Sequence, residues 1–164
     1  MLPEINVILY ATDLTGKANY ACRYAVYLAD KTGATVHVVH VAEKLPADAM
    51  DTLETYLEKF ESREDFQSSR LKMAERLLNE NFDHFWSTLD DSEQKLRSLV
   101  STVHIVESKP AEAIIKYSKD INADLIIMGS HKKGPVQAFL GSISRRVLSM
   151  ASIPTLIVPI GKNS

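Results

Sequence analysis

A glycine-rich stretch in the last third of the chain carries residue types suited to binding a phosphate group. An apolar run ends at Met128, a short polar loop follows, and Gly141 and Ser142 then open a helix-like stretch. The loop offers backbone amides, hydroxyls and positive charge from Gly129, Ser130, His131, Lys132, Lys133 and Gly134. Helix N-termini attract anions because their first N–H groups lack partners and the macrodipole is positive there. The stretch therefore predicts a phosphate-binding site of the kind used by nucleotides.

Five strand-like runs alternate with helix-like patterns along the chain. The runs are rich in β-branched residues and cover residues 5–11, 35–41, 100–107, 125–128 and 153–159. Residues 125–128 are apolar at every position, which is typical of a parallel strand covered on both faces. The alternation predicts a doubly wound, Rossmann-like α/β fold, with a five-stranded parallel sheet in the order 3-2-1-4-5 and helices on both faces. Prolines at both ends of the last run suit an edge strand.

The segment between the second and third strands is different. Residues 46–99 contain no convincing strand, and their amphipathic stripes predict two or three helices, more than a simple crossover requires. We expect one domain over residues 1–164, with this segment as a helical insertion. The insertion could pack on the sheet or on a partner, or it could cover a ligand.

The predicted topology places a ligand site at one edge of the sheet. Open α/β sheets bind ligands beyond the carboxyl ends of the strands, where the strand order reverses. In this chain that point lies between the first and fourth strands, which end at Thr12-Asp13 and at residues 129–131. Two alternatives remain open, because Asp13 and Ser142 could simply cap the helices that follow them. The dinucleotide, Walker and nucleophile-elbow motifs are absent.

Composition narrows the class of protein. A net charge of −2 and a pI near 6.2 argue against a nucleic-acid-binding protein. One cysteine, Cys22, excludes an internal disulfide and a cysteine-cluster metal site, and we expect it to be buried. No apolar run approaches the roughly 20 residues that span a bilayer, so we expect no membrane insertion. The chain starts without the features of a signal peptide, and we expect a cytoplasmic location.

These residues together resemble the universal stress protein family. The resemblance rests on Ile8–Asp13 after the first strand, Lys109–Ile114 opening a helix, Ala123–His131, Gly141-Ser142 and Ile153–Pro159. In the nucleotide-binding branch, a signature G-x2-G-x9-G-[ST] wraps the phosphates of ATP or AMP. The resemblance implies that Asp13 contacts adenosine, that Val41 touches adenine and that Gly129, Gly141 and Ser142 bind phosphate. Their neighbours in the implied site are Ala11, Thr12, Met128, Ser130 and Ile143.

The chain departs from the signature in the loop. Lys132 stands where the second glycine should be, and the loop to Gly141 is one residue shorter than the signature requires. Gly134 could supply the tight turn, although Pro135 beside it lacks an N–H group. Either the lysines compensate and alter the phosphate preference, or the loop is too tight for a triphosphate and leaves AMP, another ligand or none. His131 is a further candidate phosphate ligand.

The resemblance implies an adenine-nucleotide-binding stress-response protein that acts as a sensor or regulator. We expect ATP or AMP, with Mg²⁺ as an optional companion, and little or no turnover because no residue reads as a general base for water. Slow hydrolysis or autophosphorylation occurs in some relatives, and Ser130 and Ser142 would be the candidates. The alternative is a nucleotide-free dimeric module that regulates a protein partner, or an accessory to a transporter or kinase. The family habit implies a homodimer through the last strand, at Thr155, Leu156, Ile157 and Val158.

Overall fold

The computed structural model describes residues 1–15, 18–54, 62–131 and 140–161. Its centre is an all-parallel sheet in the order β3-β2-β1-β4-β5, which confirms the predicted topology. The strands are β1 (Val7–Thr12), β2 (Thr35–Glu43), β3 (Val100–Ser108), β4 (Leu125–His131) and β5 (Thr155–Ile160). β1 lies in the middle and is almost entirely buried, so the sheet is built around the first strand of the chain.

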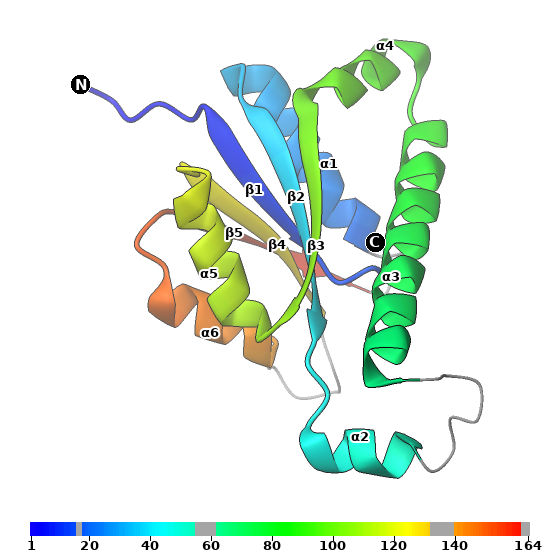
Figure 1. Ribbon diagram of the computed structural model, residues 1–164. Helices are drawn as coiled ribbons and strands as arrows, with labels where there is room; N and C mark the ends of the chain where they lie inside the picture. The colour runs from blue at the N-terminus through cyan, green and yellow to red at the C-terminus, as the bar shows by residue number, and fades with distance from the viewer. Residues whose placement is uncertain (16–17, 55–61, 132–139, 162–164) are drawn as a thin grey trace.

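Helices cover both faces of the sheet (Figure 1). Helices α1 (Ala18–Thr32) and α3 (Arg63–Ser87) pack on one face, and α5 (Pro110–Asp120) and α6 (Ser142–Met150) pack on the other. The buried stripe of α1 consists of small side chains, which let the helix approach the sheet closely: Ala21, Cys22, Ala25, Val26 and Ala29. The helix ends at Gly33, whose φ of 73° is left-handed and costs glycine little.

The segment between β2 and β3 is helical, as predicted. It contains α2 (Ala47–Glu54), α3, α4 (Asp91–Gln94) and a 3₁₀ turn, η1 (Lys95–Leu99). Ser62 is the N-cap of helix α3, and its hydroxyl accepts the Asp65 N–H. The helix then runs unbroken past Asn79 and Asn81. Phe85, Trp86 and Leu89 near its C-terminal end join the hydrophobic core beneath α1. This end of the segment therefore packs on the sheet.

The strand ends extend further than the apolar pattern indicates. The fourth strand was expected to stop at residue 128 and the second at residue 41, whereas β4 continues to His131 and β2 to Glu43. Both extensions are held by backbone pairing with the outer neighbours β5 and β3. Polar residues can continue a strand wherever a ladder partner is present, so hydrophobicity alone underestimates these lengths. None of the helices in the described ranges is long and apolar enough to cross a membrane.

Candidate functional site

The sheet contains a notch at its carboxyl edge because its central strand is short. The pairing of β1 ends at Thr12 opposite His40 on one side and at Ala11 opposite Met128 on the other. Both neighbours then run three residues further, β2 to Glu43 and β4 to His131. Above the end of β1, the backbone edges of these overhanging segments face each other without a strand between them. A ligand can bind between these edges, as expected where strand order reverses.

A cavity of about 520 Å³ fills this notch. Ligand pockets for small molecules typically measure roughly 300–1,000 Å³. Its wall combines the ends of β1, β2 and β4 with the first turns of α5 and α6. The lining residues are Tyr10, Ala11, Thr12, Asp13, Val39, His40, Val41, Glu43, Pro110, Ile114, Met128, Gly129, Ser130, Leu140, Gly141, Ser142, Ile143, Ser144, Arg145 and Ile160.

Two hydroxyl groups join the end of β4 to the start of α6. The buried Ser130 Oγ accepts the Gly141 N–H at 3.3 Å. The Ser144 hydroxyl, also buried, donates to the Gly129 carbonyl at 3.5 Å, a longer and weaker contact. These bonds hold the helix N-terminus beside the strand end, so that both line one side of the cavity.

The N-terminus of α6 lies open toward the cavity. Gly141 is the N-cap residue and has no side chain, so no side chain caps this helix in the described part of the chain. Ser142 is the first helical residue rather than the cap, which removes the simple capping role considered for it. Arg145 follows one turn later, and its guanidinium donates to the Leu140 carbonyl at 3.2 Å on the cavity rim. Open amides and a cation make this the anion-binding side.

The turn after β1 presents a carboxylate on the opposite side. Asp13 Oδ1 accepts hydrogen bonds from the Thr15 N–H at 3.0 Å and from the Thr15 hydroxyl at 2.7 Å. Leu14 between them has a φ of 64°, a left-handed conformation that a leucine adopts only under constraint. The residues that would show whether Asp13 also caps α1 include 16 and 17, which lie outside the described residues. The structure thus shows Asp13 organising a tight turn at the cavity.

The remaining wall is mainly apolar. Val39, Val41, Pro110, Ile114 and Met128 line it from β2, α5 and β4. A flat hydrophobic ring would fit between such side chains, with its polar edge against the overhanging peptide groups of β2.

Two ring-bearing side chains at the base of the cavity are held in place. His40 Nδ1 lies 2.9 Å from the Thr12 carbonyl and so ties β2 to the end of β1. Burial raises the pKa of the Tyr10 phenol far above its ordinary value, so this ring remains neutral.

Ten of the predicted site residues line the cavity: Ala11, Thr12, Asp13, Val41, Met128, Gly129, Ser130, Gly141, Ser142 and Ile143. His131 ends β4, and its side chain is not described; Lys132 and Gly134 lie outside the described residues. That these residues bind a ligand stays a prediction.

Sequence reasoning missed other lining residues, notably Glu43 and Pro110, and it left Arg145 as a solvated residue of a pair from which one arginine could reach a phosphate. Pro110 and Arg145 each sit in the first turn of a helix that follows a strand, which is a signal the sequence does contain. Glu43 was missed because the second strand was ended two residues too early.

A family model, the universal stress protein family, matches residues 4–159. The chain belongs to this family. The matched range includes the helical segment, which carries none of the motifs on which the sequence resemblance rests. Among curated relatives, the universal stress protein MJ0577 of Methanocaldococcus jannaschii is 28% identical over 156 residues, covering 92% of this chain and 93% of that protein. A universal stress protein of Thermus aquaticus is 32% identical over 153 residues, covering 92% and 96%.

Solved structures of universal stress proteins share this architecture. The structure of MJ0577 superposes with a TM-score of 0.67 at 24% identity, over 99% of this chain and all of that chain. A universal stress protein in complex with cAMP gives a TM-score of 0.56 at 14% identity, over 97% of this chain and 100% of that one. The Archaeoglobus fulgidus protein in complex with dAMP gives 0.52 at 15%, over 96% and 99%. Similarity at these identities establishes the fold of a universal stress protein.

Proposed function

We propose that this protein binds an adenine nucleotide, ATP or AMP, in the notch above β1, and that it senses or regulates a stress response with little or no turnover. The observation that carries the proposal is the arrangement of the cavity. An apolar slot bordered by peptide groups lies beside a carboxylate turn, and an open helix N-terminus with an arginine lies opposite. These three environments match a base, a ribose and a phosphate.

The charges of the cavity favour one orientation of the nucleotide. Asp13 and Glu43 stand at the ends of β1 and β2, whereas Arg145 stands on α6. A phosphate next to the two carboxylates would be repelled, and the amides of α6 attract it. The phosphates are therefore assigned to Gly129, Ser130, Gly141 and Ser142, and the ribose hydroxyls to Asp13.

The base belongs in the apolar slot between β2 and α5. Val41 and Met128 offer flat contact. The Thr35 N–H donates to the Asn6 carbonyl, and peptide groups of a parallel strand alternate in direction, so those of Val41 face the notch, where β1 does not reach. Such peptide groups can pair with the polar edge of adenine. Two relatives of the same fold, solved in complex with cAMP and with dAMP, support an adenine ligand.

Binding without rapid turnover fits the polar groups nearest the strand ends. The Asp13 carboxylate is bonded to Thr15 within its own turn, and the His40 ring is bonded to the Thr12 carbonyl. A general base must aim a lone pair at a water beside the phosphate, and the Asp13 carboxylate lies on the side of the cavity opposite the N-terminus of α6. Mg²⁺ would enter with ATP as a companion of its phosphates. We place this activity in the cytoplasm.

The direct test is to denature freshly purified protein, identify any released nucleotide, and titrate ATP, ADP and AMP by calorimetry. Micromolar binding of at least one of them is expected, and comparison of the three gives the phosphate preference of the loop that contains Lys132. Absence of co-purified nucleotide together with no heat at millimolar ligand would contradict the proposal. It would favour the nucleotide-free interaction module instead.

We further propose that the protein forms a homodimer through β5, which is an edge strand in the sheet. The Ile126 N–H donates to the Pro154 carbonyl, and peptide groups of a parallel strand alternate in direction. Thr155 and Ile157 therefore direct their peptide groups away from β4, where a second β5 could pair with them. Sedimentation velocity should show a dimer that is weakened by Ile157→Pro, which removes the outward N–H, and kept by Ile157→Val. A wild-type monomer at all concentrations would contradict this.

A further inference from the structure

Helix α3 reaches the two strand ends that frame the cavity. It lies beside the sheet at the β3 edge, far from the cavity in sequence (Figure 1). Two of its polar side chains nonetheless donate hydrogen bonds to backbone carbonyls at the ends of β1 and β2. The cavity of this protein is therefore bordered by segments whose positions depend on α3.

The first contact fixes the turn that carries Asp13. Asn81 Nδ2 donates to the Leu14 carbonyl at 2.8 Å, and the side chain of Asn19 donates to the Asn81 carbonyl at 3.3 Å. Leu14 is the residue in the left-handed conformation, so a bond to its carbonyl opposes relaxation of the turn. Loss of this bond would release Asp13 from its place at the cavity.

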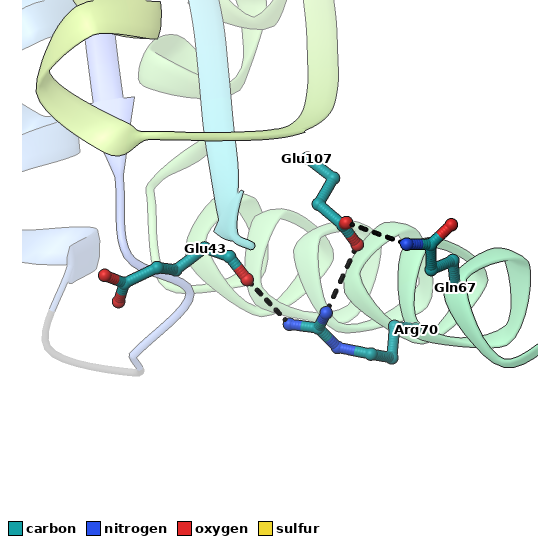
Figure 2. A network of polar contacts seen from close by, with 4 residues as sticks. All are labelled: Glu43, Gln67, Arg70 and Glu107. Atoms are coloured by element: carbon teal, nitrogen blue, oxygen red, sulfur yellow. Dashed lines mark hydrogen bonds and ion pairs between the residues drawn. The ribbon is translucent and has the colours of Figure 1, made fainter. Parts of the chain in front are cut away.

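The second contact fixes the end of β2. Arg70 Nη2 donates to the Glu43 carbonyl at 3.0 Å, while its Nη1 pairs with Glu107 at 3.2 Å (Figure 2). Gln67 donates to the other oxygen of Glu107 at 3.4 Å. The Arg70 and Glu107 side chains are only 26% and 11% exposed, so water screens their attraction poorly. Arg70 thus ties the overhang of β2 to α3 by a hydrogen bond, and its partly buried ion pair with Glu107 of β3 holds the guanidinium in place.

Both contacts belong to one face of one helix. Arg70 and Asn81 are separated by three helical turns, about 16 Å along the axis. The same stripe carries the buried side chains of Ala74, Leu78 and Phe85, which hold α3 against the rest of the molecule. A shift of α3 away from this surface would therefore break both contacts together.

We infer that Asn81 and Arg70 are positioning residues of the nucleotide site. Through them, the free energy of nucleotide binding is coupled to the docking of α3 against the rest of the protein. The inference rests on the proposed function. When α3 is docked, Asp13 and the β2 overhang are held in place for the nucleoside. Because such coupling is reciprocal, a bound nucleotide must in turn hold α3 against the sheet. A protein partner that pulls on α3 would release nucleotide, and nucleotide would oppose that partner.

The test uses the full chain and AMP. Calorimetry should show weaker AMP binding in Asn81→Ala and in Arg70→Met, within the roughly 5- to 150-fold range typical of coupling between sites. Arg76→Met is the matched control, because Arg76 lies on the same helix and its ion pair within the described ranges is with the exposed Glu80. Its affinity should equal that of the wild type. Hydrogen exchange of the α3 amides should slow when AMP is added to the wild type.

A double variant separates positioning from general damage to the fold. In an Asp13→Ala background, Asn81→Ala should weaken AMP binding no further, because its effect acts through Asp13. Additive losses of affinity, or wild-type affinity in both Asn81→Ala and Arg70→Met, would overturn the inference. Unchanged exchange of α3 with saturating AMP would also overturn it. A wild type that binds no adenine nucleotide would instead overturn the proposed function, and this inference with it.

Discussion

At the end of β4, Gly129 lies against Ile160 of the neighbouring strand. A Cβ atom at position 129 would stand 2.4 Å from Ile160 Cδ1, too close for two carbon atoms. A side chain at position 129 would therefore force the Ile160 side chain to shift, so packing inside the protein favours glycine there. Gly141 differs, because a Cβ atom there would lie more than 4 Å from the other residues that the structure describes.

Gly129→Ala should lower the free energy of unfolding by about 1–3 kcal/mol, the usual cost of overpacking. Ile160→Val removes the clashing methyl group at its own cost of about 0.5–1.5 kcal/mol. Urea denaturation should show that the double variant is more stable than the sum of the two single losses predicts. Strict additivity would mean that the clash does not exist.

Cys22 shows how burial alters a single ionisable group. The Cys22 side chain projects from α1 into the hydrophobic core of the protein. Burial raises the pKa of the thiol to about 12 from an ordinary 9.0, while the charge of Arg23 lowers it. An unfolded chain loses this proton near pH 9, and the folded protein keeps it up to about pH 12. Unfolding therefore releases a proton between these values, and stability must fall as the pH rises through that window.

We expect the free energy of unfolding of the wild type to fall more steeply than that of Cys22→Ala between pH 9 and pH 11. The difference in slope should approach about 1.4 kcal/mol per pH unit, the value for one proton. Burial keeps the pKa of the folded Tyr10 phenol far above this window, so Tyr10 titrates only in the unfolded chain, and this contribution is the same in both proteins. Parallel curves in a denaturation series would contradict the assigned burial of the thiol.

At the scale of elements, Asp124 fixes the start of the central strand. The Asp124 Oδ2 accepts the N–H groups of Asn6 and Val7 at 2.8 and 2.9 Å, and its own N–H donates to the Val7 carbonyl. One side chain at the entry of β4 thus sets the entry of β1 beside it. This register in turn decides where β1 ends and the notch begins.

Asp124→Ala should destabilise the protein by about 1.5–3 kcal/mol, because two backbone donors lose a charged acceptor. Asp124→Asn should retain most of the stability, since a single amide oxygen can accept both bonds. Thermal and urea denaturation of the two variants would check this. Equal losses for alanine and asparagine would contradict the argument and assign the effect to charge alone.

The order of the helices and strands and the topology of the sheet could be predicted from the sequence. The exact ends of the strands and the contacts between distant elements could not. Periodic apolar residues at 5–11, 35–41 and 125–128 predict strands because burial selects them. The overhangs at Glu43 and His131 depend on hydrogen bonds to neighbouring strands, which no local pattern records. The contacts of Asn81 and Arg70 join residues 67 and 27 positions apart in sequence and become visible only in three dimensions.

In the whole molecule, the candidate site exists because the central strand of the sheet is short. A short central strand between two longer ones leaves a notch, and α5, α6 and the turn after β1 close it into a cavity. Two side chains of helix α3 donate hydrogen bonds to the end of β2 and to the turn after β1, both of which border the cavity. The ends of four strands, β1, β2, β4 and β5, the starts of two helices and the turn after β1 thus line the site in the described part of the chain.

The central claim is that an adenine nucleotide places its phosphate at the N-terminus of α6, and calorimetric titration of AMP into Gly141→Val tests it most directly. The backbone at Gly141 has a φ of −67° and a ψ of 167°, which valine adopts readily, and the added Cβ meets no atom of the other described residues within 4 Å. The fold should therefore survive, which an unchanged unfolding midpoint would show. Ser152 is exposed, and Ser152→Val serves as the control.

We expect Gly141→Val to weaken AMP binding by at least about tenfold, or 1.4 kcal/mol, while Ser152→Val binds as the wild type does. Wild-type affinity in a folded Gly141→Val would contradict it.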